Sequence, residues 1–252
     1  MIRVLAFLLL MPFAAHAEEV IGGLSQNTVS ITANFNGSEI FVFGAVKREE
    51  PIPVDRGPLE VVITIQGPDQ RVTVRKKERT FGIWVNRDSV EVDHAPSFYA
   101  IASTGRLGDI MSETERQRYS LGFDRAIRLV GAPDDVADPR SFTRAIARIR
   151  QENGLYKQQD GIVDLQQETL FSTNVRLPAN LVEGDYVTRM YLLRDRKVLH
   201  VSETEIAVRK AGLERLIYTT AHEQPLLYGL LSIAVALFAG WGASEAFRLL
   251  RR

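Results

Sequence analysis

Hydrophobic and polar residues alternate along most of the segment from Glu19 to Leu107. This period of two is typical of β-strands with one buried face. Segments of this kind, separated by Gly, Pro and Asn, predict strands at residues 29–35, 40–43, 59–65, 71–75, 80–92 and 98–102. The segment Ile40-Phe41-Val42-Phe43 contains no polar residue, so we expect an inner strand that is not half-exposed there.

The period changes to about 3.6 residues within residues 108–154, which predicts two or three helices. Ser112-Glu113-Thr114-Glu115 has the spacing of a capping box, in which a serine hydroxyl caps the start of a helix. Asp138-Pro139 predicts a second helix start, because proline fits the first helical turn. The apolar face of this second helix consists of Phe142, Ile146 and Ile149.

The alternating pattern returns after Asp160-Gly161. Residues 162–177, 186–193 and 198–208 predict about four further strands. These strands require another sheet, which is either a second small sandwich or the open side of the first. We favour two β lobes separated by the helical insert. The predicted fold class is therefore mainly β, with antiparallel Ig-like β-sandwich lobes and a helical insert.

The first 17 residues have the three parts of a secretory signal. Arg3 precedes the apolar run Val4–Leu10, and Ala15-His16-Ala17 places small residues where a signal peptidase reads them. We therefore predict a cleaved signal peptide at residues 1–17, so that Glu18 begins the mature chain. The alternative is an uncleaved N-terminal anchor.

The C-terminal region contains an uncharged run that is long enough to cross a membrane. The run from Pro225 to Ala243 has 19 residues, and a helix needs ~20 to span the hydrocarbon core. Arg248, Arg251 and Arg252 follow it, and basic residues at this position predict that the C-terminus is cytoplasmic. We expect a transmembrane helix at 225–247 and an exported N-terminal region.

Small residues recur at every fourth position of this helix. They are Ser232, Ala236, Gly240 and Ser244. Such a stripe lets a second helix approach closely, and a single anchor does not require it. We therefore expect a partner in the membrane, either a second copy of the chain or another integral membrane protein. The alternative is that small residues are simply common in membrane helices.

These patterns together give the predicted order of segments. The segments are a signal peptide (1–17), an N-terminal β-sandwich lobe (18–107), a helical insert (108–157), a second β lobe (158–211), a juxtamembrane segment (212–224), the transmembrane helix (225–247) and a basic cytoplasmic tail (248–252).

Composition excludes several classes of function. The chain has 31 basic and 31 acidic residues, and this balance does not indicate the basic face of a nucleic-acid-binding protein. It contains no cysteine, which excludes disulfides and thiolate sites. His94, His200 and His222 are far apart and lack the spacing of metal ligands. We therefore expect no nucleic-acid partner, no metal or cofactor, and no catalytic residues.

The most unusual local sequence is FGIWVNRDS, at residues 81–89. Trp84 lies on a predicted strand, and Asn86-Arg87-Asp88 has the composition of a tight turn. Aromatic and arginine side chains dominate binding hot spots, which favours a partner-facing surface. The hypothetical partner patch consists of Trp84, Asn86, Arg87, Phe98 and Tyr99. The alternative is a core tryptophan followed by a solvated turn.

Five basic residues lie close together on the predicted strand that precedes this segment. They are Arg71, Arg75, Lys76, Lys77 and Arg79. Charges on an exposed edge strand prevent it from pairing with other chains, and we favour this interpretation. The alternative is a surface for anionic headgroups or for an anionic ligand such as sulfite or sulfate.

Several stretches together resemble a known family. They are Leu24-Ser25-Gln26, Gly67-Pro68, Val72–Arg79, Gly82–Val90 and Pro96–Ala100. With the C-terminal anchor, they are similar to the putative transmembrane protein family of alphaproteobacteria, a family of unknown function. The resemblance implies an inner-membrane protein with a periplasmic region. It also implies a permease of the sulfite-exporter kind as a partner, and it supplies no catalytic residues.

The sequence thus predicts a non-enzymatic accessory protein in the inner membrane, anchored by one helix, with its N-terminal region in the periplasm. We expect it to contact a membrane partner such as a transporter. The alternative is a periplasmic binding module for a small anion or an envelope component.

Overall fold

The structure is a computed structural model that describes residues 18–32, 35–48, 57–130, 136, 138–210 and 213–250. The predicted signal peptide at 1–17 lies outside the described residues, and so do Arg251 and Arg252. The described chain divides into a large unit that extends to residue 208 and a small unit that contains the C-terminal helices.

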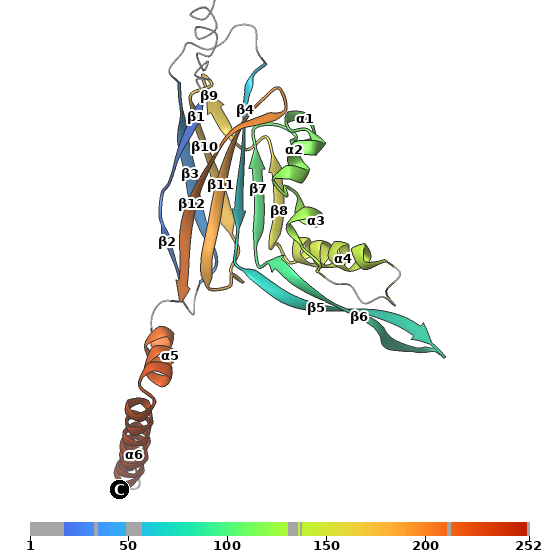
Figure 1. The fold of residues 1–252 in the computed structure, drawn as a ribbon. Coiled ribbons are helices and arrows are strands. Elements are labelled where there is room, and N and C mark those ends of the chain that lie inside the picture. Colours follow the sequence, from blue (N-terminus) through green and yellow to red (C-terminus); the bar gives the residue numbers. More distant parts are fainter. Residues whose placement is uncertain are drawn as a thin grey trace, which may run out of the picture. The chain divides into compact units, whose positions relative to one another are not determined.

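Two sheets make up most of the large unit (Figure 1). The four-stranded sheet has the order β1-β3-β10-β9, and the six-stranded sheet has the order β2-β12-β11-β4-β7-β8. Only the β7–β8 pair is described as parallel; the other pairs with a defined register are antiparallel. The strands are β1 (Glu19–Leu24), β2 (Thr28–Ile31), β3 (Ser38–Lys47), β4 (Leu59–Gln66), β7 (Tyr99–Ser103), β8 (Tyr156–Asp160), β9 (Asp164–Gln166), β10 (Leu170–Leu177), β11 (Gly184–Arg194) and β12 (Lys197–Lys210).

Strands from both β regions of the sequence share both sheets. β10 pairs with β3, and β11 pairs with β4, so the two regions form one sandwich. The prediction of two separate β lobes is therefore wrong. The alternative holds, in which the later strands pair with the earlier ones in shared sheets. The sequence pattern shows which segments are strands but does not show their partners. The mainly β fold class with a helical insert is confirmed.

The two sheets face each other with buried apolar side chains. Gly22 of β1 lies so close to the end of the Met190 side chain of β11 that a Cβ at this position would require Met190 to move. The buried residues of this layer include Ile40, Val42, Phe171, Val175, Ile63, Ile65, Tyr186, Met190 and Ile206.

The outer face of the four-stranded sheet differs from the sequence expectation. β3 is an inner strand of this sheet, yet Phe41 and Phe43 are both exposed. Their rings stack on each other with centroids 5.7 Å apart. The expectation that residues 40–43 are not half-exposed is wrong, because only Ile40 and Val42 face the second sheet.

Short helices and one longer helix pack on the other face of the six-stranded sheet (Figure 1). They are α1 (Leu107–Ile110), α2 (Glu113–Arg118), α3 (Phe123–Ala126) and α4 (Pro139–Glu152). The Ser112 hydroxyl accepts a hydrogen bond from the Glu115 amide at 3.3 Å, which confirms the predicted cap. The six-stranded sheet is thus covered on both faces.

Helix α4 begins at the predicted proline but buries a different face. Phe142 and Ile146 are buried, whereas Ile149 is 46% exposed, so its predicted place in the apolar face is wrong. Arg150 is buried in its place because its guanidinium has partners in the core. The helical region 107–152 has four described helices, rather than two or three, because α1 and α3 are too short to show a period.

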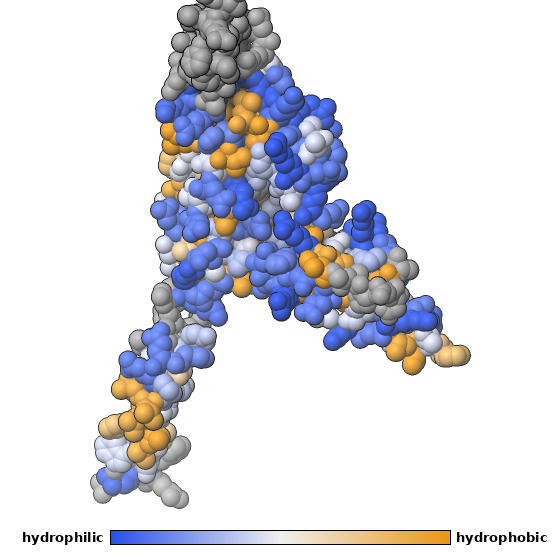
Figure 2. Space-filling model, viewed as in Figure 1, coloured by the Kyte–Doolittle hydropathy of each residue, from blue (hydrophilic) through white to orange (hydrophobic). Residues whose placement is uncertain are grey.

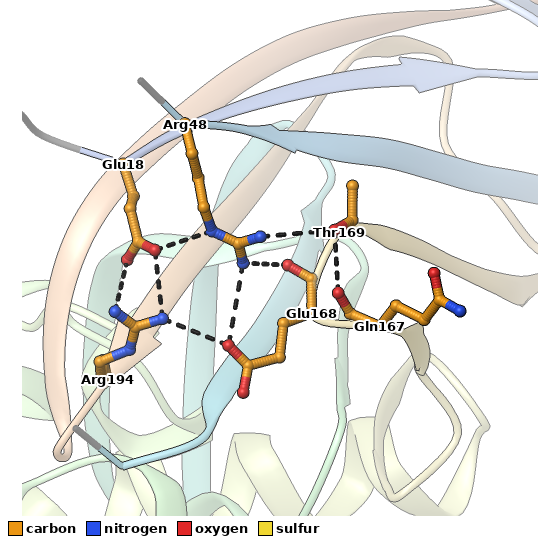
Figure 3. A network of polar contacts seen from close by, with 6 residues as sticks. All are labelled: Glu18, Arg48, Gln167, Glu168, Thr169 and Arg194. Carbon is orange, nitrogen blue, oxygen red and sulfur yellow. Dashed lines mark hydrogen bonds and ion pairs between the residues drawn. The ribbon is translucent and has the colours of Figure 1, made fainter. Parts of the chain in front are cut away.

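One end of the sandwich is closed by a network of ion pairs (Figure 3). The Arg194 guanidinium is 3.0 Å from the Glu18 carboxylate and 3.3 Å from the Glu168 carboxylate. Arg48 is 2.9 Å from the same Glu18 carboxylate and also contacts Thr169. Because Arg194 lies on β11 and Glu18 precedes β1, the network joins the two sheets.

The small unit contains α5 (Leu213–Glu223) and α6 (Pro225–Leu250). Within α6, the segment Pro225–Ser244 has a mean hydropathy of 1.9, and its most apolar window has no residue buried in the protein. Among the described helices, it is the one that is long and apolar enough to cross a membrane.

Candidate interaction surface

A two-stranded hairpin separate from both sheets carries most of the predicted surface residues (Figure 1). It consists of β5 (Asp69–Thr80) and β6 (Ile83–Pro96), paired antiparallel. The turn is Phe81-Gly82, with φ values of 51° and 86°. Two residues with positive φ form the hairpin turn whose twist matches the strands, and glycine favours it.

The predicted turn at Asn86-Arg87-Asp88 is wrong, because these residues lie within β6. Lys77 faces Asn86 and Lys76 faces Asp88, so Arg87 has no cross-strand partner in the register. An extra residue of this kind is a β-bulge, which bends the strand and redirects side chains. Polar turn-forming residues here mark a bulge rather than the chain reversal.

The base of the hairpin is fixed to the helical layer. Arg150 donates hydrogen bonds to the Ala95 carbonyl at 3.2 Å and to the Gln70 side chain at 3.4 Å. The Tyr156 hydroxyl donates to the Pro96 carbonyl at 2.9 Å. Burial raises the pKa of Tyr156 above its usual value, so this hydroxyl remains a donor well above neutral pH. The base is therefore held in a defined position.

The distal part of the hairpin exposes large hydrophobic side chains (Figure 2). We define the hairpin tip as residues 77–87. Within it, Ile83 is 67% exposed and Trp84 is 69% exposed, and Phe81 and Val85 are also exposed. Single exposed hydrophobic residues are common, but a cluster of four at one strand end is typical of an interaction site.

The structure separates the predicted partner patch into two groups. Trp84, Asn86 and Arg87 are exposed at the hairpin tip. Phe98 and Tyr99 are 0% and 4% exposed, so they belong to the core and not to a surface patch. The alternative of a core tryptophan is also wrong, because Trp84 is 69% exposed.

The basic strip joins the exposed half of the patch. All five of its residues lie on β5 and are exposed. Arg79 pairs with Trp84 and Lys77 with Asn86, and directly opposed residues share one face of a ribbon. Residues 75–89 carry five basic and two acidic side chains. Arg87 and Glu78 are 3.3 Å apart, but both are exposed, so this pair neutralises little of the surface.

The transmembrane stripe lies on α6. Ser232, Ala236, Gly240 and Ser244 are spaced by four residues and therefore share one helix face. The Ser232 hydroxyl donates to the Tyr228 carbonyl at 2.8 Å within the same helix. No described atom lies within 4 Å of a Cβ built on Gly240, so this face is open to a second helix.

Sequence reasoning missed one further feature, an arginine-lined cavity of about 570 Å³ on the helical side of the six-stranded sheet. Its arginines are Arg118, Arg125, Arg128 and Arg189. Three of them fall within RQRYSLGFDRAIR (residues 116–128), and this concentration of arginine in a short segment is the signal that was available. Among the described residues, no group of three His, Asp or Glu side chains has the geometry of a metal site.

Comparison with known families decides the relationship of the chain. The model of the family described as "Putative transmembrane protein (Alph_Pro_TM)" matches residues 19–249. The chain belongs to this family. The family match and the apolar segment of α6 agree on a membrane protein with one candidate C-terminal span.

Other comparisons give little more. No curated protein matches the sequence. Among solved structures, the chain is similar to the crystal structure of Spo0M, a sporulation control protein from Bacillus subtilis, at 12% identity and a TM-score of 0.30. The match covers 82% of this chain and 55% of that one, so this chain spans about half the length of that structure. A likeness at this level carries no argument about function.

Proposed function

We propose that this chain is a non-enzymatic accessory protein of the inner membrane that contacts an integral membrane partner, such as a transporter, through its hairpin tip. The observation that supports this most is the exposure of Ile83 and Trp84 beside Lys77 and Arg79. An aromatic side chain among apolar and basic neighbours is the composition of a binding hot spot.

The hairpin offers two modes of contact. The tip side chains fill a pocket of the partner, and the free edge of a two-stranded ribbon pairs with an extended strand. Among the described strands, β5 and β6 pair only with each other, which leaves such edges. The bound base lets the tip present these groups without first becoming ordered, which lowers the entropic cost of binding.

The proposed orientation places the N-terminal region in the periplasm. Arg248 follows the apolar segment of α6, and the sequence continues with Arg251 and Arg252. Basic residues beside a span favour the cytoplasmic side. The signal peptide predicted at residues 1–17 supports the same orientation, because export of the N-terminus before a C-terminal stop leaves the intervening region outside the cytoplasm.

Site-specific photocrosslinking in cells tests the proposal. A photoreactive phenylalanine analogue replaces Trp84 in the full chain, and Leu199, an exposed apolar residue of β12, is the matched control position. We expect position 84 to crosslink to an integral membrane protein and position 199 to give no such product. Equal products from both positions, or none from position 84, contradict the proposal.

The stripe on α6 gives a second test of a partner in the membrane. Leucine at positions 236 and 240 removes the close approach that small residues permit, so Ala236→Leu with Gly240→Leu is expected to reduce co-purification of the partner. Ala234→Leu is the control, because position 234 lies about 160° from Ala236 and about 120° from Gly240 around the helix. The same partner yield from both variants contradicts a contact through the stripe.

The alternative function is the capture of a small anion or an envelope component. The sequence pointed to the basic strip for this function, but the arginine-lined cavity supports it better. The basic strip lies on an open ribbon, where Arg75 and Lys76 line only a groove beside α4. The arginine-lined cavity is the better site for an anion.

A further inference from the structure

The arginine-lined cavity lies between a sheet face and the short helices. Its floor is formed by side chains of β4, β7 and β11, and its walls by the segment from Arg118 to Arg128 and by the start and end of the hairpin. The floor residues are Thr64, Gln66, Tyr99, Arg189 and Tyr191. A volume of about 570 Å³ is within the range of pockets that bind small molecules.

The side chains that line this cavity include more basic than acidic groups, and three of the arginines also pair with glutamates beside the cavity: Arg118 with Glu115, Arg125 with Glu113 and Arg189 with Glu203. Four arginines line it, and Asp69 is the one acidic side chain among its described lining residues. Asp69 is 3.6 Å from the His94 ring, which also lines the cavity. Guanidinium groups recognise the oxygen atoms of carboxylates and phosphates with two parallel hydrogen bonds. The guanidinium groups of the lining therefore suit an anion.

Two of these arginines are held in place by groups that leave other donors free. Arg189 donates to the Glu203 carboxylate at 2.9 Å and to the Gln66 side chain at 3.2 Å. Arg125 donates to the Leu121 carbonyl at 3.4 Å and forms an ion pair with Glu113 of α2. Each guanidinium has five N–H donors, so both keep donors for a ligand in a fixed geometry.

Arg128 differs from these two. Its side chain forms no hydrogen bond or ion pair with any described residue, and only its backbone is bonded, to His94. A charged side chain that lines a cavity without an internal partner is available to a ligand.

Tyrosines form the flat part of the lining. The rings of Tyr119 and Tyr191 meet edge to face, with centroids 5.5 Å apart. Burial raises the pKa of Tyr99 and of Tyr191, which keeps both hydroxyls protonated at neutral pH. An aromatic wall beside fixed cations matches a ligand that has both a flat apolar part and an oxyanion group.

We propose that this cavity binds a small organic anion, with its carboxylate, sulfate or phosphate group against the arginines and its flat part against Tyr119 and Tyr191. The site deepens the alternative function and rests on it. It does not involve the hairpin tip, so a failure here leaves the crosslinking result of Trp84 unaffected.

Calorimetric titration of the detergent-solubilised full chain tests the site. Phenyl phosphate is the probe, inorganic phosphate lacks the flat part, and phenol lacks the charge. We expect saturable binding of phenyl phosphate, weaker binding of inorganic phosphate and none of phenol. Vesicles of phosphatidylglycerol that compete with phenyl phosphate identify a lipid headgroup as the source of this chemistry, and lack of competition identifies a free solute.

Variants locate the binding. Arg128→Gln and Arg189→Gln are each expected to weaken phenyl phosphate binding about tenfold or more, as for the loss of a charge-assisted hydrogen bond. Arg148→Gln, an exposed arginine outside the cavity, is the control and retains binding. Tyr119→Ala is expected to weaken phenyl phosphate binding while leaving inorganic phosphate binding unchanged.

The melting temperature of each unliganded variant separates a lost site from a lost fold. Arg128→Gln is expected to melt at the wild-type temperature, because its side chain loses no hydrogen bond or ion pair with a described residue. Wild-type affinity in both Arg128→Gln and Arg189→Gln overturns the proposal. So does an equal loss in Arg148→Gln, or the absence of saturable heat with phenyl phosphate at millimolar concentration.

Discussion

Two apolar strand segments of this protein lie in opposite surroundings. Ile63 in β4 is 1% exposed, with strands on both sides, the second sheet on one face and the helices on the other. Ile83 in β6 is 67% exposed, with one neighbouring strand. The residue types are alike, so composition does not decide the outcome. Burial in the core explains the apolar residues of the first segment, and the proposed partner would explain those of the second.

Two arginines show the same contrast between buried and exposed surroundings, and they give the largest expected difference in the free energy of unfolding. Arg194 in the network of Figure 3 is buried, whereas Arg87 at the hairpin tip is exposed. Arg194→Met removes the buried cation that joins Glu18 and Glu168 across the sheets and leaves only Arg48 beside them, so we expect a loss of about 3–5 kcal/mol in the free energy of unfolding. Arg87→Met is expected to change it by less than about 0.5 kcal/mol. Urea unfolding of the full chain in detergent, followed by circular dichroism, measures both.

Equal losses in these two variants contradict the assignment of the network as a connection between the sheets. Both arginines contact both glutamates, but Arg194 is the sharper test, because it is more deeply buried and lies in the sheet opposite to that of Glu18, whereas Arg48 follows β3 in the same sheet.

The apolar pair itself gives the next effect. Ile63→Ala leaves a cavity between packed layers, and we expect it to lower the free energy of unfolding by about 2–4 kcal/mol. Ile83→Ala removes an exposed side chain and is expected to change it by less than about 0.5 kcal/mol. The same unfolding experiment serves, and each variant is the control of the other. A large loss in Ile83→Ala would show that the tip packs against the protein.

The base of the hairpin joins the exposed tip to the buried core, and a substitution there is expected to have a smaller effect on stability. Tyr156→Phe removes the hydrogen bond to Pro96 at the hairpin base, and we expect a loss of about 1 kcal/mol at neutral pH. An unfolded tyrosine ionises near its usual pKa of 10.0, whereas burial keeps Tyr156 protonated there in the folded state. Above pH 10 the unfolded state therefore binds fewer protons, and the stability that Tyr156 contributes is lost as pH rises.

The difference between wild type and Tyr156→Phe should accordingly narrow above pH 10 in thermal unfolding. A difference that is constant from pH 7 to pH 11 contradicts the assignment of a buried, neutral hydroxyl at this site.

Local sequence signals predicted local structure well. The capping box before α2 and the proline start of α4 are both present. The apolar segment of α6 followed from length and composition alone. Each of these features depends on contacts within a few residues of chain.

Features that depend on distant partners were not predictable from one sequence. β3 and β10 pair across about 130 residues of chain, and nothing in the strand pattern specifies that choice. The same limit explains Tyr99, which was placed on a surface because its aromatic type suits one, and Ile149, which the period alone placed in the core. The cavity arginines come together only when the short helices pack on the sheet.

We propose that the apolar side chains of the hairpin tip bind a partner and contribute little to the stability of the fold. The most direct test is Trp84→Ser in the full chain, purified from native membranes beside Leu199→Ser. We expect both variants to melt at the wild-type temperature. The loss of a hot-spot tryptophan weakens binding by about 2 kcal/mol or more, about thirtyfold in affinity, so the partner should disappear from Trp84→Ser alone. A wild-type yield of the partner with Trp84→Ser would contradict the account.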